Sequence, residues 1–326
     1  MQIVFLGPKQ LRFGFVWIIG LVFLTGFILN WDRLARQMFG VKPGVRLEGY
    51  LVGGMLPEEV TEIVRSMAAK IDREPKNAGY FLETGELITA VPGRQVDISR
   101  NVSQVCLAQP NSNLKLLISQ VEPSVTDDLF QPIYHGNTGR SAVALAINVA
   151  WGEEYLDSIL KTLADAKVKV TFFFVGTWVK AFPEEVRTIA AAGHEIANHG
   201  SYHGHPTQMG KEELKKLVLE NQTLLAATIG RKVPRLFAPP YGEMNSLVVN
   251  VAAELGFRTI LWSVDSIDWK NPTPEVLLDR VLSKIEPGGI ILLHPTIATK
   301  EALPRLIKGL QQKGLQPGTI SMVLQK

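Results

Sequence analysis

The second half of the chain alternates between short apolar runs and amphipathic stretches. Residues 142–147 (Ala-Val-Ala-Leu-Ala-Ile) form an unbroken apolar run, which is typical of a strand buried on both faces of a sheet. Residues 153–166 follow, and Ile159, Leu160 and Leu163 fall there on one face of a helix. The same alternation predicts further strands at 168–174, 195–197, 235–237, 258–262 and 290–293, and further helices at 183–192, 211–229, 245–255, from 274 and at about 302–313.

This alternation predicts an α/β fold with a parallel sheet. Six or seven strand–helix units in about 185 residues favour a sheet that closes, or nearly closes, into a barrel. In such folds the chemistry lies at the carboxyl ends of the strands. Five candidate residues fall just after expected strands: Asn148, His199, Pro239, Asp265 and His294. We therefore expect one functional site at this edge of the sheet.

The N-terminal end of the chain differs from the rest. Residues 13–29 carry no charge and follow Lys9 and Arg12. As a helix with a rise of about 1.5 Å per residue, this run just reaches across a thin hydrocarbon core. No small-x-small cleavage site follows it. We therefore expect residues 1–36 to form an uncleaved transmembrane anchor with the bulk of the chain outside the cytoplasm. A cleaved signal peptide is the alternative.

Residues 44–123 are expected to form a small α+β module, followed by a linker at residues 124–139. Pro57 suits the first turn of a helix, and the two glutamates after it suit the positive end of that helix. Residues 52–60 resemble the opening of small peptidoglycan-binding modules of extracytoplasmic bacterial proteins. A packing or spacer domain is the alternative interpretation.

Composition narrows the class of protein and of site. Hydrophobic residues make up 46% of the chain and charged residues 20%, which is typical of a globular protein. The net charge is only +3, and no Lys/Arg-dense run with interleaved aromatic residues indicates nucleic-acid binding. Cys106 is the only cysteine, so the sequence excludes an intrachain disulfide and a thiolate metal cluster. Any transition metal must be held by the six histidines, carboxylates and water.

The candidate chemistry centres on His199 and His203. Two imidazoles four residues apart reach one metal ion from a helical turn or a tight loop. The pair alone is weak evidence, but its position after a strand and the later His294 strengthen it. For His135 we expect no role in a site. His205 is a surface residue in our interpretation, with an unusual third ligand as the alternative.

Five short motifs occur in order along residues 140–326. They are Lys-Val-Thr-Phe-Phe-Phe-Val-Gly at 169–176, Gly-His-Glu-Ile-Ala-Asn-His at 193–199, Pro-Pro-Tyr-Gly at 239–242, Trp-Ser-Val-Asp-Ser-Ile-Asp-Trp at 262–269, and Ile-Leu-Leu-His at 291–294. Together they resemble the NodB-homology polysaccharide deacetylases, which are carbohydrate esterases. This resemblance implies a distorted (β/α) barrel of about seven strands that hydrolyses N-acetyl groups of a glycan.

The resemblance implies a role for each matching residue. His199 and His203 match two ligands of a divalent metal, usually zinc, which polarises the acetamido carbonyl and supplies the attacking water. His294 matches the general acid that protonates the leaving amine, and Asp265 matches the carboxylate that tunes this acid. Tyr241 lies in the motif whose backbone forms part of the oxyanion site.

Two tryptophans are candidates for contact with a sugar. We expect Trp269 and Trp151 to line a glycan-binding groove and to stack on the sugar. Packing in the hydrophobic core is the alternative.

The chain departs from the family where hydrolysis needs carboxylates. The family motif Thr-Phe-Asp-Asp-Gly is replaced here, so that Asn148 stands at the catalytic base and Val149 at the metal carboxylate. Ala238 replaces the arginine that pairs with the base. An amide does not accept a proton near neutral pH, and valine does not bind metal. We expect Glu153 and Glu154 to be solvated residues in the first turn of a helix. The alternative is that one of them substitutes for the missing base or metal ligand.

We therefore expect a membrane-anchored protein at the surface of a bacterium that binds N-acetylated cell-wall glycan, with deacetylation weakened or lost. The alternative is an active deacetylase of peptidoglycan or a related glycan, a hydrolase of non-peptide carbon–nitrogen bonds with a substitute metal ligand. Zinc or another divalent metal is expected only if the site works. Residues 148–155 resemble the first motif of a sporulation-associated subgroup, which implies spore or vegetative envelope glycan as the target.

Overall fold

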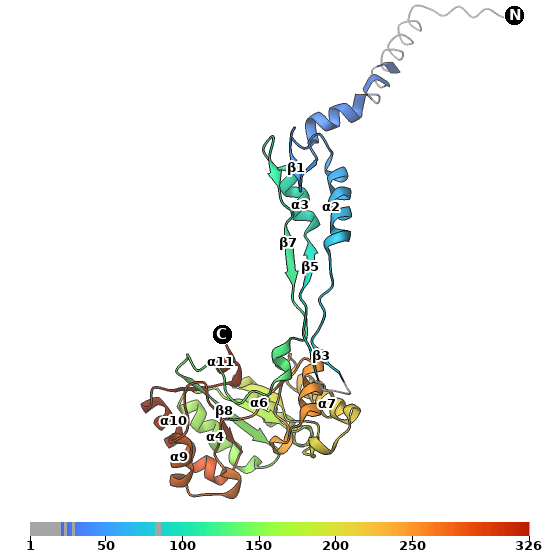
Figure 1. Ribbon diagram of the computed structural model, residues 1–326. Helices are drawn as coiled ribbons and strands as arrows, with labels where there is room; N and C mark the ends of the chain where they lie inside the picture. Colours follow the sequence, from blue (N-terminus) through green and yellow to red (C-terminus); the bar gives the residue numbers. More distant parts are fainter. Residues whose placement is uncertain (1–20, 23–24, 28–29, 82–85, 326) are drawn as a thin grey trace, which may run out of the picture. The chain divides into compact units, whose positions relative to one another are not determined.

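Figure 1 shows the computed structural model of the chain, which describes residues 21–22, 25–27, 30–81 and 86–325. The chain divides into two compact units. The first contains the residues up to 76 together with 91–123, and the second contains 77–90 together with the residues from 124 onward. Each unit has its own hydrophobic core, so each is described by itself.

The expected transmembrane anchor at residues 1–36 lies mostly outside the described residues. The apolar run 13–29 contributes only residues 21–22 and 25–27 to the described part. Residues 30–39 are helical. Among the described residues, no helix is both long enough and apolar enough to cross a bilayer.

The first unit contains helices α2 (Pro57–Ile71) and α3 (Ile98–Cys106), which pack against each other over an apolar core. Helix α2 begins at the predicted proline, where the Glu59 carboxylate accepts a hydrogen bond from the Leu56 N–H. Five short strands complete this unit: β1 (Arg46–Leu47), β2 (Tyr50–Leu51) and β6 (Asn113–Leu114) in one sheet, and β5 (Gly93–Val96) and β7 (Ile118–Val121) in an antiparallel pair.

The module expected at residues 44–123 is interrupted by a segment that belongs to the second unit. In this segment β3 (Gly79–Tyr80) pairs antiparallel with β4 (Leu87–Ile88). The expected linker at 124–139 is packed as well, because it contains the 3-10 helix Asp127–Phe130. A small apolar cluster joins these pieces to the second unit: Ala78, Val125, Leu129 and Ala253.

The second unit is an α/β domain with a curved parallel sheet. Seven strands follow one another in the order β12-β11-β10-β9-β8-β14-β13, and β15 pairs with β8 at its amino end. The strands are β8 (Ala142–Val149), β9 (Thr171–Phe174), β10 (Glu195–Asn198), β11 (Leu236–Phe237), β12 (Arg258–Thr259), β13 (Val264–Asp265), β14 (Ile290–Leu293) and β15 (Gln316–Gly318). The α/β class and the seven-stranded parallel arrangement predicted from the sequence are confirmed.

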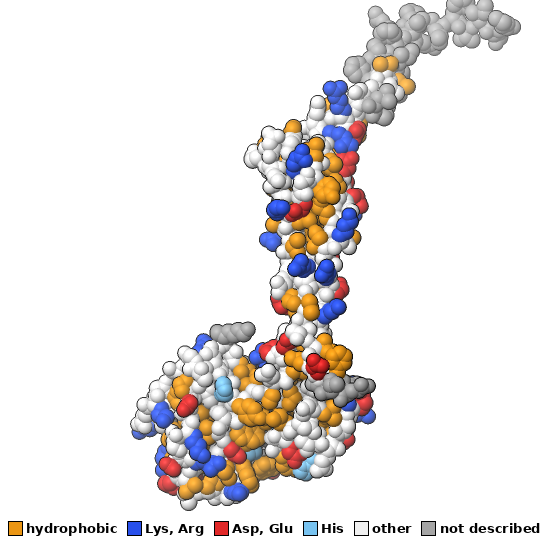
Figure 2. Space-filling view, viewed as in Figure 1, with side chains coloured by type: hydrophobic (Ala, Val, Ile, Leu, Met, Phe, Trp, Pro, Cys, Tyr) orange, Lys and Arg blue, Asp and Glu red, His pale blue; other side chains and the backbone are white. Residues whose placement is uncertain are grey.

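Helices connect the parallel strands and cover the sheet (Figure 1). They are α4 (Glu153–Asp165), α5 (Gly176–Ala181), α6 (Pro183–Ala191), α7 (Lys211–Ile229), α8 (Ser246–Glu254), α9 (Pro274–Leu282), α10 (Ile297–Gln312) and α11 (Ile320–Leu324). On the face shown in Figure 2, basic and acidic side chains are interspersed over the surface.

The side chains of the central strand β8 alternate between the two faces of the sheet, and only one of these two series leads to Asn148. Successive side chains of a strand point to opposite faces. The odd-numbered residues of β8, from Val143 to Val149, belong to the large cluster under the helices. The even-numbered residues 142, 144 and 146 are all alanine and pack on the other face with residues such as Phe173 and Ala238. Asn148 is the next residue in this second series.

Candidate functional site

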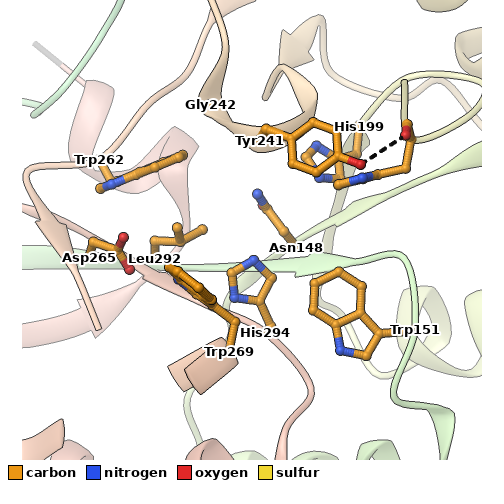
Figure 3. Close-up of a pocket in the computed structure, with 11 residues that line it drawn as sticks. Asn148, Trp151, His199, Tyr241, Gly242, Trp262, Asp265, Trp269, Leu292 and His294 are labelled. Atoms are coloured by element: carbon orange, nitrogen blue, oxygen red, sulfur yellow. Dashed lines mark hydrogen bonds between the residues drawn. The ribbon is translucent and has the colours of Figure 1, made fainter. Parts of the chain in front are cut away.

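A cavity of about 700 Å³ lies at the carboxyl ends of the strands (Figure 3). The residues that line it are Asn148, Trp151, His199, His203, Tyr241, Gly242, Trp262, Asp265, Trp269, Leu292 and His294. The lining includes most of the residues that the sequence predicted for the site: Asn148, Trp151, His199, His203, Tyr241, Asp265, Trp269 and His294, but not Pro239 or Val149. Side chains more than 140 residues apart in the sequence therefore meet because parallel strands end at the same edge.

His199 follows β10 and is held by the backbone of the neighbouring strand. Its Nδ1 lies 2.7 Å from the Ala238 carbonyl oxygen. Since a carbonyl only accepts, Nδ1 carries the proton and donates it, which leaves Nε2 with a lone pair. Burial, and secondarily the nearby His203, lower the pKa of His199 to about 3. The imidazole is therefore neutral near physiological pH.

His203 reaches the cavity from a tight loop, one of the two geometries that the sequence allowed. The Asn198 Oδ1 accepts the Gly200 N–H at 2.8 Å, and Gly200 has a φ of +87°, which favours glycine. The ring centroids of His199 and His203 are 5.2 Å apart. Burial, and then the nearby His294, lower the pKa of His203 as well.

His294 follows β14 and is fixed by Asp268, which is fully buried. The Asp268 Oδ1 lies 2.8 Å from His294 Nδ1. The Asp268 Oδ2 accepts the His294 backbone N–H at 2.5 Å and the Thr299 hydroxyl at 2.5 Å. One carboxylate thus orients both the backbone and the ring of His294.

The expected partner of His294 was Asp265, and the structure corrects this expectation. The Asp265 Oδ1 accepts the Ile267 N–H at 2.8 Å in a local turn, and the side chain lines the cavity without pairing with His294. Ile267 has a positive φ of 58°, which turns the chain and brings Asp268 under His294. Both aspartates belong to the same motif, and the sequence alone did not distinguish them.

The end of β8 has none of this support. Asn148 is 4% exposed, and its Oδ1 has no hydrogen-bond partner within the described part of the chain. Val149 is fully buried in the cluster under the helices and does not line the cavity. Ala238 is 3% exposed and packs on the other face.

The donor set at this edge does not fit a catalytic zinc site. Such a site has three protein ligands and one open position. His199 and His203 supply two imidazoles, and no group of three His, Cys, Asp or Glu side chains among the described residues is arranged to hold a metal ion.

The alternative ligands considered from the sequence lie elsewhere. Glu153 and Glu154 are exposed in the first turn of α4, where they line a separate hollow with other acidic residues. His205 is exposed, and its Nδ1 lies 2.8 Å from the Glu243 carboxylate. We therefore derive no reaction step through a metal.

Aromatic rings form most of the cavity wall. Trp151 stacks on His294, with centroids 5.2 Å apart and planes at 16°. Trp151, Tyr241 and Trp269 are 43%, 54% and 48% exposed, so each ring offers a face to solvent. Tyr241 in turn stacks on His205, with centroids 4.5 Å apart. The alternative, that Trp151 and Trp269 are core residues, does not hold.

The chain is similar to proteins whose names describe glycan deacetylation. Residues 135–260 match the family model of polysaccharide deacetylases. The chain is 36% identical to the uncharacterized protein YlxY of Bacillus subtilis (strain 168) over 284 residues, which cover 84% of this chain and 88% of YlxY. It is 30% identical to a peptidoglycan-N-acetylglucosamine deacetylase of Bacillus cereus over 197 residues, which cover 59% of this chain and 71% of that enzyme.

Among solved structures, the chain is similar to BA3943 of Bacillus anthracis, which is described as a pseudoenzyme of the CE4 family. The TM-score is 0.59 and the identity 36%, over 81% of this chain and 94% of BA3943. A BA3943 mutant described as having restored enzymatic activity matches with a TM-score of 0.59 and 35% identity, over 81% of this chain and 97% of that chain.

Proposed function

The chain belongs to the polysaccharide deacetylase family, and we propose that it binds an N-acetylated glycan in the cavity of Figure 3 without deacetylating it. One observation carries this proposal. The rings of His199 and His294 keep their supporting hydrogen bonds, whereas Asn148 and Val149 at the end of β8 supply neither a base nor a metal ligand. The cavity therefore keeps residues that can recognise a glycan, whereas the residues that hydrolysis needs are replaced.

The loss of hydrolysis follows from the chemistry of the side chains. Attack on an acetamido carbonyl needs a group that takes a proton from water, and such a base contributes about 10²–10⁴ to the rate. The Asn148 amide does not take up a proton near neutral pH. His199 and His203 leave a divalent metal one protein ligand short, and lost ligands weaken metal binding strongly.

Binding of a glycan is supported by the aromatic wall. Sugar rings present apolar C–H faces, and half-exposed aromatic rings with a polar neighbour suit such amphipathic ligands. Trp151, Tyr241 and Trp269 surround the cavity in Figure 3. The name of the similar peptidoglycan-N-acetylglucosamine deacetylase supports N-acetylglucosamine as the sugar that this cavity binds.

We further propose that the chain acts on the outer side of a bacterial cytoplasmic membrane, where peptidoglycan lies. The support is the apolar run at residues 13–29 and the mild basicity of the chain, which suits a polyanionic envelope. A role in the envelope of sporulating cells extends this proposal and rests on the likeness of residues 148–155 to the sporulation-associated subgroup.

The test uses the full chain and tetra-N-acetylchitotetraose, with binding followed by calorimetry and hydrolysis by acetate release in the presence of zinc. We expect binding without acetate. Trp269→Ala should weaken binding about fivefold to tenfold because it removes a stacking face. Trp31→Ala is the matched control, since Trp31 lies in the first unit and is 50% exposed, close to the 48% of Trp269.

Two results would contradict the proposal. If neither tetra-N-acetylchitotetraose nor purified peptidoglycan binds, the cavity is not a glycan site. If the unmodified chain releases acetate with zinc and His199→Ala does not, the chain is an active deacetylase with a metal ligand that we have not recognised.

A further inference from the structure

We infer that Asn148 selects the acetamido group of the glycan, so that the cavity distinguishes an N-acetylated sugar from its deacetylated form. This inference rests on the proposed function, because it assumes that a glycan enters the cavity. It goes further by assigning to Asn148 a positive role in recognition. In this interpretation Asn148 is a specificity-determining residue and more than the remnant of a lost base.

The first observation is the unpaired amide of Asn148. An unsatisfied buried polar atom costs about 1–3 kcal/mol, so native proteins rarely keep one without a reason. Five buried side-chain polar atoms in the described part of the chain lack a partner, and only the Asn148 Oδ1 belongs to a residue that lines the cavity. In Figure 3 the Asn148 amide points into this cavity.

The other buried asparagines in the described part of the chain all make side-chain hydrogen bonds within the fold, although the Oδ1 of the fully buried Asn221 also lacks a partner. Asn101 is fully buried, and its Nδ2 donates to the carbonyls of Asp97 and Leu117 while its Oδ1 accepts the Leu117 N–H. Asn198 is fully buried, and its Nδ2 donates to the Val218 carbonyl. Asn148 is equally removed from solvent but has no such partner, which is the arrangement expected of a group that meets a ligand.

The second observation is the match between the Asn148 amide and an acetamido group. Asparagine offers both a donor and an acceptor. An acetamido group offers an N–H and a carbonyl oxygen, so either orientation of the Asn148 amide finds a partner. A carboxylate at this position would accept only, and it would repel the carbonyl oxygen. Asparagine therefore keeps the shape of an aspartate and adds the donor that the acetyl carbonyl needs.

The third observation is that, among the described residues, no counter-charge faces the Asn148 amide. A deacetylated sugar carries an ammonium group, and a desolvated cation without a partner is costly. The buried Asp268 carboxylate already accepts hydrogen bonds from His294 and Thr299. Asp265 lines the cavity, but Figure 3 shows it on the other side of Leu292 from Asn148.

The test compares two ligands on three forms of the full chain by calorimetry: tetra-N-acetylchitotetraose, and chitotetraose, in which all four amines are free. The unmodified chain should bind the acetylated ligand at least about tenfold more tightly. Asn148→Leu should lose about 10- to 100-fold in affinity for the acetylated ligand. Asn148→Asp should lose a similar factor and shift the preference toward the deacetylated ligand, because it adds a negative charge.

Asn148→Leu is chosen because it is expected to fold. Leucine is close in shape to asparagine and removes an unpaired buried amide, so its melting temperature should equal or exceed that of the unmodified chain. Asn113→Asp is the matched control for Asn148→Asp. It changes the net charge equally at an exposed position in the first unit, and both affinities should stay within about twofold.

The outcomes separate the inference from the proposed function. If the unmodified chain binds the acetylated ligand and folded Asn148→Leu keeps both its affinity and its preference, Asn148 does not recognise the acetamido group. If the unmodified chain binds both ligands equally, the cavity does not select acetylation, although it binds glycan. If it binds neither, the proposed function itself is wrong.

Discussion

The two sides of the cavity are held in different ways. On the histidine side, His199 donates to a backbone carbonyl and His294 is fixed by a buried carboxylate. On the β8 side, the Asn148 Oδ1 has no hydrogen-bond partner among the described residues, and Val149 is part of the apolar core. The rings of His199 and His294 are thus positioned by hydrogen bonds within the protein.

This difference indicates which property of the site has been kept. A site that had simply decayed would be expected to lose the hydrogen bonds of its imidazoles as well as its carboxylates, since each bond contributes only about 1 kcal/mol to stability. Here the supporting hydrogen bonds and the aromatic wall are present, and the missing groups are those that hydrolysis needs. This difference supports the proposal that the cavity serves recognition.

The largest expected effect comes from rebuilding the β8 side. Asn148→Asp, Val149→Asp and Ala238→Arg together should raise zinc-dependent acetate release at least about 10³-fold. They return a base, the cation that pairs with the base and, once zinc binding draws the new carboxylate at position 149 out of the core, a metal ligand. The double variant without Ala238→Arg should not suffice. Acetate release from tetra-N-acetylchitotetraose measures both. An active double variant would show that the arginine is dispensable.

The second effect tests whether Val149 belongs to the core. Val149→Asp alone should lower the free energy of unfolding by about 3–5 kcal/mol, because it buries an unpaired charge. Asn148→Asp is the neighbouring control and should cost less than half as much, since that side chain faces the cavity. Urea denaturation measures both. Equal losses would mean that the two side chains do not differ in their surroundings.

The third effect concerns the histidine side and separates the two aspartates. Asp268→Ala should destabilise the chain by about 3 kcal/mol, because the backbone N–H of His294, its ring Nδ1 and the Thr299 hydroxyl all lose their acceptor. Asp265→Ala removes one hydrogen bond at a half-buried position and should cost about 1 kcal/mol. The reverse order in thermal or urea denaturation would restore Asp265 as the partner of His294.

The smallest expected effect concerns the pH dependence of stability and a histidine just before β10. His194 lies at the amino end, where burial lowers its pKa from 6.5 to about 4 and its Nδ1 accepts the Val170 N–H at 3.2 Å. The unfolded chain therefore binds a proton between pH 6.5 and 4 that the folded chain refuses, so stability falls as the pH falls through this window.

Between pH 7 and 5 the contribution of His194 should amount to about 2 kcal/mol. His194→Gln should remove this part of the pH dependence, because glutamine keeps an acceptor for the Val170 N–H and does not titrate. Denaturation at both pH values measures the difference. An unchanged pH dependence in the variant would mean that His194 is not the group responsible.

The strand–helix pattern predicted most of the second unit because its strands are buried on both faces and read as apolar runs. The run 142–147 and the helix from 153 correspond to β8 and α4. Strand β13 escaped prediction: it has two residues and lies at the edge of the sheet, where packing on neighbours, and not local pattern, sets its conformation.

The sequence predicted those site residues that lie shortly after the ends of strands. His199, His203 and His294 followed expected strands and do line the cavity. The choice between Asp265 and Asp268 depended on the positive φ of Ile267, which no sequence pattern revealed. The association of residues 77–90 with the second unit was equally hidden, because it rests on long-range packing of Ala78.

The most direct test of binding without hydrolysis is a proton NMR experiment on the full chain with tetra-N-acetylchitotetraose and excess zinc. Saturation transfer to the acetyl methyl protons reports binding, and the free acetate signal reports hydrolysis in the same tube. We expect saturation transfer, with no more acetate from the unmodified chain than from His199→Ala. Steady acetate release that His199→Ala abolishes would contradict the central claim.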